Sequence, residues 1–356
     1  MNDILEQIRA ANEQPFELPT YDGFEEIKKQ VVIDPNVDYP DPEYLIEIGG
    51  VPTIPKGNLV ALSAKWKNGK TFFCDIISAI FLGSDQFASC RSRQAEGRVL
   101  FFDTEQAESD TARIRKTIDA MIPESRQGDY DVSCLRDIPI DKDMEEGATI
   151  SRMDFIKRFI EIDHPDLVVI DGIADLIYNY NDVVESQSIV NQLAALANRH
   201  NCAIVVVMHQ NKGKQDKNMK GHLGTMLFQK CSDVFNVERC GSIFVASHAV
   251  SRHRNCEDIC FKLDANAVPM DAVADRQLQV EMERQQSESR NREMISAVIP
   301  EDGSPVKCSA VIDYLIENHP FQRAKAYQIL NDVIKTGWLV KVDRSTVKLN
   351  TEQTNR

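Results

Sequence analysis

The segment from residue 57 to residue 264 alternates short apolar runs with amphipathic stretches, and this alternation limits the folds open to the chain. Each run is continuous and ends in polar or small residues; the runs read NLVALSA, RVLFFDTE, PDLVVIDG and CAIVVVMHQ. Among them lie stretches with helical spacing, at residues 71–82, 110–121, 152–162 and 186–198. Continuously apolar strands separated by helices are typical of a parallel sheet covered on both faces. We therefore predict an α/β fold whose ligand lies at the carboxyl ends of its strands.

Composition and spacing divide the chain into four expected parts. Residues 1–56 hold 4 basic and 12 acidic side chains, a net charge of −8, and several prolines, which favours an extended acidic arm. Residues 57–268 form the α/β core, in which the later runs DVFNVER, IFVASHAV and DICFKLD extend the sheet as hairpins. Residues 269–290 are charged and rich in glutamine, which indicates a helical linker. Residues 291–350 form a small separate unit.

That small unit has the element order of a winged helix-turn-helix. We expect helices at 292–299, 309–317 and 322–335, followed by strands in WLVKVD and TVKLN. The third helix of such a domain normally enters the major groove of duplex DNA, and Arg323 and Lys325 on this helix are suitable phosphate contacts. Winged helices also serve as protein–protein modules, so this alternative stays open.

Charge and cysteine usage set wide limits only. A net charge of −14 argues against nucleic-acid binding by the surface as a whole. The local basic patches are nevertheless compatible with nucleic-acid binding at particular places. No apolar run approaches the roughly 18 residues of a membrane span, and the acidic, polar N-terminus does not resemble a secretion signal. The nine cysteines are scattered singly, which favours reduced thiols in the cytoplasm.

The run NLVALSA leads into Asn68-Gly69-Lys70-Thr71, which is the ending of a phosphate-binding loop. The usual loop is a glycine, four residues and Gly-Lys-Ser/Thr, and Ala64 replaces the first glycine. Backbone N–H groups and a helix N-terminus hold the phosphates there, while the lysine reaches the β- and γ-phosphates and the hydroxyl ligates Mg²⁺. A chance Gly-Lys-Thr is the alternative, but the strand before it and the helix after it favour the loop. We predict that ATP and Mg²⁺ bind the residues Ala64, Lys65, Trp66, Lys67, Asn68, Gly69, Lys70 and Thr71.

Three further strand ends carry polar side chains. Asp171 ends PDLVVIDG and is the expected partner of Thr71 in holding Mg²⁺. RVLFFDTE places Asp103 and Glu105 two residues apart, where a carboxylate could deprotonate water or could simply be a solvated strand end. CAIVVVMHQ ends in His209-Gln210, of which the glutamine could contact the γ-phosphate and the histidine could be structural.

The stretch NKGKQDKNMKG after Gln210 is basic and contains glycine. A solvated loop is one interpretation. A loop that contacts DNA is the other, and its candidate contacts are Lys212, Lys214, Lys217 and Lys220.

Taken in this order, the motifs resemble the RecA-like P-loop ATPase core, and more specifically the RepA-like branch of hexameric replicative helicases, related to the DnaB group. The resemblance covers about residues 48–264 and is carried by SAKWKNGKT, VLFFDTEQ, LVVIDGIADL, VVVMHQNK and SRHRNCEDICFKLD. It implies that Glu105 is the catalytic base, that His209-Gln210 is the sensor, and that Arg252 and Arg254 enter the neighbouring subunit's site. The alanine at position 64 and the bulky, charged loop middle depart from the family pattern.

The resemblance also implies an assembly and an activity. Residues that act in a neighbouring subunit imply a head-to-tail ring, with a hexamer expected, and loop 211–224 would face its channel and hold single-stranded DNA. We expect an ATP-hydrolysing DNA translocase or helicase that acts in replication or in the transfer of a mobile element. The alternatives are an ATP-dependent adaptor or regulator that assembles on DNA without unwinding it, and a non-catalytic scaffold in which Ala64 marks a decayed site.

Overall fold

A nine-stranded sheet forms the centre of the core, in the order β12-β11-β10-β9-β3-β8-β7-β5-β6. The computed structural model describes residues 23–141, 149–213, 216–252 and 254–350. Six neighbouring strands of the sheet are parallel: β3 (Leu59–Ala64), β5 (Val99–Asp103), β6 (Tyr130–Cys134), β7 (Leu167–Asp171), β8 (Ala203–His209) and β9 (Asp233–Cys240). Three antiparallel strands extend it beyond β9: β10 (Ile243–Ser251), β11 (Ile259–Leu263) and β12 (Pro269–Asp271).

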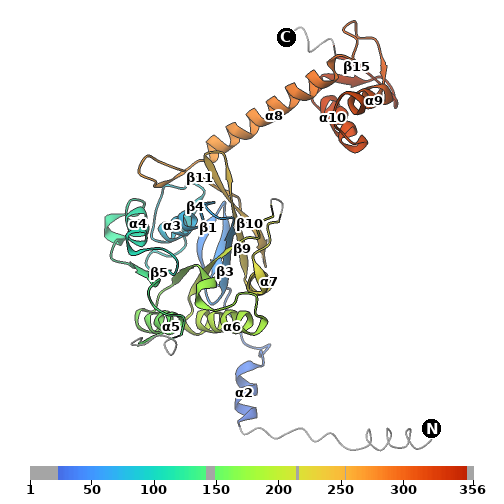
Figure 1. Cartoon of the computed structure of the whole chain (residues 1–356). Coiled ribbons are helices and arrows are strands. Elements are labelled where there is room, and N and C mark those ends of the chain that lie inside the picture. The colour runs from blue at the N-terminus through green and yellow to red at the C-terminus, as the bar shows by residue number, and fades with distance from the viewer. Residues whose placement is uncertain (1–22, 142–148, 214–215, 253, 351–356) are drawn as a thin grey trace, which may run out of the picture. The chain divides into compact units, whose positions relative to one another are not determined.

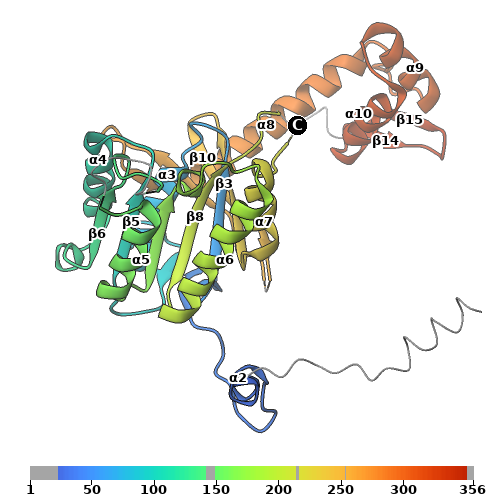
Figure 2. The same ribbon diagram turned by 60° about the horizontal axis from the view of Figure 1, so that its bottom comes forward.

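Helices cover both faces of this sheet. The central strands β3, β5, β7 and β8 are therefore buried along nearly their whole length. On one face α5 (Arg152–Asp163), α6 (Val183–His200) and α7 (Gly221–Lys230) share one apolar cluster (Figure 2). On the other face α3 (Lys70–Phe81) and α4 (Glu108–Asp119) share a second cluster. The predicted α/β fold with a mainly parallel sheet is confirmed, and the ends of the four predicted core helices lie within three residues of the observed ones.

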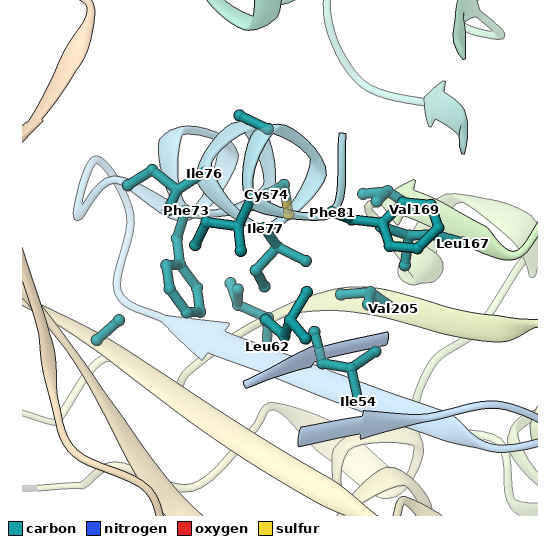
Figure 3. Close-up of a cluster of buried hydrophobic side chains, with 14 of the residues drawn as sticks. Ile54, Leu62, Phe73, Cys74, Ile76, Ile77, Phe81, Leu167, Val169 and Val205 are labelled. Carbon is teal, nitrogen blue, oxygen red and sulfur yellow. The ribbon is translucent and has the colours of Figure 1, made fainter. Parts of the chain in front are cut away.

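The packing of α3 shows why this helix is held so firmly against the sheet. Ten of its twelve residues are buried, and Phe73, Cys74 and Ile77 point toward Leu62 and Val205 of the central strands (Figure 3). A helix that is apolar on nearly all sides must be enclosed by other elements. Figure 1 shows the small strands β1 and β4 beside it, so that α3 is enclosed between two sheets.

The expected boundary of the acidic arm at residue 56 differs from the structure. Residues 44–55 form β1 (Tyr44–Ile48) and β2 (Val51–Pro55), which pair with β4 (Cys90–Ser92) in a three-stranded sheet and contribute to the core. Gly49 and Gly50 both have positive φ, 57° and 77°, as the two-residue turn of a tight hairpin requires. The Gly-Gly pair between apolar residues is the hairpin signal, and the prolines upstream masked it.

Residues up to Pro42 form a unit separate from the rest of the chain. Its described helix, α2 (Phe24–Val31), begins at Gly23 and carries exposed apolar side chains at Phe24, Ile27 and Val31.

The C-terminal elements are α8 (Val273–Ser296), β13 (Val306–Lys307), α9 (Cys308–Asn318), α10 (Arg323–Lys335), β14 (Leu339–Lys341) and β15 (Thr346–Leu349). The strands form a sheet in the order β13-β15-β14, and the helices bury an apolar cluster of their own against it.

Two expectations for the tail differ from what is observed. The expected linker of residues 269–290 begins with strand β12, and α8 then continues without a break into the helix expected at 292–299, where it ends at Ser296. Side-chain pairs four residues apart, such as Arg284 with Glu288, stabilise its exposed middle. Strand β13 was missed because a strand of two residues is too short to show a periodic pattern.

Within the described ranges no helix is both long and apolar enough to cross a bilayer.

Candidate nucleotide-binding site

The phosphate-binding loop is formed by the turn from β3 into α3. Ala64 is the last residue of β3; it is fully buried and pairs with His209 on one side and Val237 on the other. Its backbone is that of a strand, so alanine fits there without strain. The residue that must be glycine is Gly69, which has a φ of 81° and whose added Cβ would lie 2.8 Å from a ring carbon of Phe244.

The N-terminus of α3 is open to an anion. Gly69 caps the helix with no side-chain hydrogen bond, and the first turn contains no acidic residue. The unpaired N–H groups and the positive end of the helix dipole therefore remain available. In the loop before it, Trp66 is 70% exposed, and the Lys67 ammonium lies 4.3 Å from the centre of its ring.

Thr71 and Asp171 meet at the end of the loop. Thr71 Oγ1 donates a hydrogen bond to Asp171 Oδ2 at 2.6 Å, although the two residues lie on α3 and at the end of β7. Burial raises the pKa of Asp171 to about 6, because a charged carboxylate is costly away from water.

This pair fits a magnesium ion. A hydroxyl and a carboxylate oxygen are ligands that Mg²⁺ accepts, and a cation would offset the cost of the buried charge. Mg²⁺ is usually held by one or two side chains together with substrate phosphates. In agreement with that pattern, the described residues contain no cluster of three or more His, Cys, Asp or Glu side chains that could hold a metal alone.

Lys70 lies inside the site and contacts His209. The ammonium Nζ is 3.2 Å from Nδ1 of His209, and the lysine is only 9% exposed. Burial lowers the pKa of Lys70, while Asp171 and Glu105 act in the opposite direction. A phosphate placed beside the ammonium would raise this pKa again, because a negative charge favours the charged form.

His209 joins Lys70 to Glu105. Its other ring nitrogen, Nε2, lies 3.8 Å from Glu105 Oε2. Interaction with the imidazole is the largest cause that holds the pKa of Glu105 below its usual range. Glu105 is therefore ionised at neutral pH, and its side chain is 59% exposed, so that water can reach it.

Asp103 and Glu105 have separate roles in the structure. Asp103 is fully buried, and its carboxylate accepts hydrogen bonds from the backbone N–H groups of Glu105 and Gln106 and from the Thr111 hydroxyl. Glu105 itself lies beyond the end of β5, on the turn that Asp103 holds in place. Because β5 ends at Asp103, the two carboxylates do not belong to one strand.

Gln210 does not accompany His209 into the site. It is buried, and its amide nitrogen lies 3.1 Å from Ser63 Oγ and 3.4 Å from Asn236 Oδ1. Successive side chains of a strand point to opposite faces, which separates the two neighbours. Gln210 thus binds three adjacent strands together, and its backbone N–H also donates to Ala64 O.

The candidate lysines after β8 differ in their surroundings. Lys212 is exposed, Lys217 forms an ion pair with Glu238, and the Lys220 ammonium lies 4.6 Å from the ring centre of Tyr180. Lys214 lies outside the described residues. Lys65 of the phosphate loop donates to Gly213 O at 2.8 Å, which connects the two loops directly.

Arg252 and Arg254 lie away from the nucleotide site of their own chain. Arg252 follows β10 at the end of the sheet where β9 begins, because Ser251 pairs with Asp233. Its guanidinium donates to the Lys230 carbonyl at 2.9 Å, and Arg254 is exposed. The phosphate loop lies at the opposite end, where β3 and β9 finish.

The two candidate residues of the tail lie at the start of α10. Arg323 and Lys325 are exposed; Arg323 lies 3.7 Å from Asp313 and Lys325 donates to Gln328 at 3.1 Å. These are weak surface contacts that a ligand could replace.

Two functional neighbours were missed by sequence reasoning. Thr104 Oγ1 donates to Gly172 O and accepts from Gly172 N, both at 2.8 Å, which ties the ends of β5 and β7 together. Asp75, one turn after Thr71, is 1% exposed and its Oδ1 has no hydrogen-bond partner among the described residues. Burial, followed by the charges of Asp171 and Asp103, raises the pKa of Asp75 well above its usual value.

A parallel sheet with a phosphate loop after one strand and a buried aspartate after another defines a P-loop nucleotide-binding domain of the ATPase type. The sequence profile of the AAA domain family matches residues 24–215, and the chain belongs to that family. No curated protein matches the chain. Among solved structures, the RadB recombinase aligns with a TM-score of 0.41 and 16% identity, over 61% of this chain and 91% of that one.

Proposed function

We propose that the chain hydrolyses Mg·ATP and acts on DNA as a ring-forming motor of the helicase or translocase kind, in replication or in the mobilisation of DNA. The observation that carries the ATPase part is the convergence of four side chains from three separate elements at one edge of the sheet: Lys70 and Thr71 from α3, Asp171 from β7, and Glu105 from the turn after β5.

Each of these residues has a distinct task in hydrolysis. Lys70 binds the β- and γ-phosphates and neutralises charge that develops during phosphoryl transfer. Thr71 and Asp171 would hold Mg²⁺, which when bound neutralises phosphate charge. Glu105 accepts the proton of the attacking water, because its lowered pKa keeps it ionised.

His209 orients the two charged groups on either side of it. Its contacts with Lys70 and Glu105 make it the residue that transmits the state of the γ-phosphate. Gln210 acts indirectly, through the three strands that its side chain joins. The assignment of the sensor thus rests on the histidine.

Assembly into a ring, with a hexamer as the proposed state, is supported by the position of Arg252 and Arg254. Neither reaches the site of its own chain, so a role at the γ-phosphate requires the site of a neighbour. Loop 211–224 would then contact single-stranded DNA in the channel through its lysines, of which Lys212 is exposed.

For the tail, we propose a winged-helix domain that binds duplex DNA. The sequence of elements from the end of α8 to β15, and the strand order β13-β15-β14, support this proposal. In it α10 would carry Arg323 and Lys325 to DNA phosphates.

The test is steady-state ATPase activity with and without single-stranded DNA, with the oligomer mass recorded in the same samples. Turnover that DNA stimulates in a ring-sized species is the expected result. ATP-driven assembly on DNA with no stimulated turnover would replace the motor by the adaptor or regulator. Absence of Mg·ATP binding at millimolar nucleotide would indicate a scaffold.

A further inference from the structure

We propose that Tyr178 is a base-stacking residue for single-stranded DNA, which rests on the proposed action on DNA. The residue follows β7 and the short helix η3 (Ile173–Leu176), so it belongs to the same edge of the sheet as Asp171. Its side chain is 59% exposed, although an aromatic ring of this size is usually largely buried.

The turn that carries Tyr178 is fixed. Glu185 Oε2 accepts hydrogen bonds from the backbone N–H groups of Tyr178 and Asn179, both at 3.0 Å. Asp182 caps α6 by accepting from Glu185 N at 2.8 Å. The exposed ring therefore stands on an ordered backbone, and little conformational entropy is lost when it contacts a ligand.

The same turn packs against the basic segment that leads into α7. Leu223 N donates to the Tyr180 carbonyl at 3.0 Å, and the Lys220 ammonium lies over the Tyr180 ring. Gly221, with a φ of 71°, permits this close approach, since a Cβ there would lie 2.7 Å from Tyr180 Cδ2. Figure 2 shows α6 and α7 side by side, so the turn before α6 and the segment before α7 form one surface.

This surface combines the two kinds of group that hold single-stranded nucleic acid. Lys220 supplies positive charge for the phosphate backbone, and Tyr178 supplies an aromatic face. A base can stack on such a face only when it is unpaired, so the ring selects single strands over duplex without reading sequence. The acidic groups of the turn, Asp182 and Glu185, are directed at backbone N–H groups.

The experiment measures binding of the full-length protein to two fluorescent probes, an oligothymidine and an abasic oligonucleotide of equal length, in the presence of a non-hydrolysable ATP analogue. Tyr178→Ala should weaken oligothymidine binding by roughly 5- to 100-fold, the range for one stacked base. It should change binding of the abasic probe by less than about twofold. Tyr178→Phe should retain binding to both.

Val184→Ala is the matched control, because Val184 is a nearby residue on α6 that is 76% exposed and carries no aromatic ring. The stacking role is contradicted if the unmodified protein binds both probes equally, or if Tyr178→Ala weakens binding of both probes to the same extent. Either result would leave the proposed action on DNA intact. A change of oligomer mass in Tyr178→Ala would assign the ring to a contact between protein chains instead. No binding of either probe by the unmodified protein would overturn the proposed action on DNA as well.

Discussion

The nucleotide site and the C-terminal unit place their candidate residues in opposite environments. Lys70, Thr71 and Asp171 are wholly or partly buried and have short contacts, Thr71 with Asp171 and Lys70 with His209. Arg323 and Lys325 stand on the surface of α10 with single, weak partners. The nucleotide site depends on the packing of individual side chains, so the loss of any one of them should have a large effect on nucleotide binding or hydrolysis. The surface of α10 depends on net charge, so each residue there should contribute little to DNA affinity.

The strongest test of the comparison is Lys70→Ala. Removal of the only buried ammonium of the described site should reduce ATP hydrolysis by roughly 10³-fold, the upper range for one contact that stabilises transition-state charge. ATP binding should also be lost, which a fluorescent nucleotide titration measures. Lys67→Ala is the control, because Lys67 belongs to the same loop but is exposed. Equal losses in both variants would mean that only the net charge of the loop matters.

Glu105→Gln should separate binding from chemistry. Loss of the general base lowers turnover by on the order of 100-fold or more, while nucleotide affinity is retained. Steady-state turnover and equilibrium binding are measured on the same preparation, with Glu108→Gln on the exposed surface of α4 as control. Normal hydrolysis by Glu105→Gln would assign the base to another residue.

Gly69→Ala tests how strongly the packing of the phosphate loop contributes to the stability of the fold. The added Cβ meets the Phe244 ring at 2.8 Å and forces alanine into positive φ, so we expect a loss of stability of about 1–3 kcal/mol in urea unfolding. Gly83→Ala is a matched control, because Gly83 has a φ of 93° with no atom within 4 Å of its added Cβ. The difference between the two variants measures the contact with Phe244 alone. Equal losses of stability in the two variants would show that packing against Phe244 is not what requires glycine at this position.

Asp75→Asn should stabilise the protein without nucleotide. The raised pKa of Asp75 means that the folded state holds a proton that the unfolded state releases above its ordinary value of 3.8. Stability therefore falls as the pH rises above that value, and asparagine removes the penalty. We expect a melting temperature higher by about 2–6 °C at pH 8 and a smaller gain at pH 5. A variant that melts lower at both values would show that the carboxyl is needed for packing.

The smallest effect is expected in the tail. Arg323→Ala with Lys325→Ala should weaken duplex binding several-fold and reduce the salt dependence of log K by about 2, close to one unit for each lost phosphate contact. Arg158→Ala, on the exposed surface of α5, serves as control. An unchanged salt dependence would favour a protein-binding role for α10.

The sequence predicted the fold of the core because its signals are periodic and redundant. Continuous apolar runs and helical spacing identify four of the six parallel strands, β3, β5, β7 and β8, with four of the helices that cover them, and Gly-Lys-Thr identifies the loop after β3. Strand β6 and helix α7 were not predicted, and β9, expected in a hairpin, also pairs in parallel with β3. The hairpin β1–β2 was missed because composition outweighed the short Gly-Gly turn. The continuity of α8 was missed because an exposed helix has no apolar stripe that marks where it ends.

Within the site, the sequence predicted which strand ends carry chemistry but not how neighbouring side chains divide between faces. The separation of His209 from Gln210 depends on where β8 ends relative to the loop, which no local pattern specifies. Asp75 gave no signal either, since an aspartate on an amphipathic helix is expected in solvent. Its burial follows from the enclosure of α3 between two sheets, which is a property of the whole fold.

The position of His209 also determines which of its ring nitrogens accepts and which donates a hydrogen bond. An ammonium can only donate, so Nδ1 of the imidazole must accept from Lys70, and the single ring proton of the neutral form lies on Nε2 toward Glu105. The contact between the lysine and the histidine requires that tautomer. The imidazole therefore joins the residue that binds the phosphates to the strand that leads to loop 211–224, in addition to the hydrogen bond from Lys65 to Gly213 O.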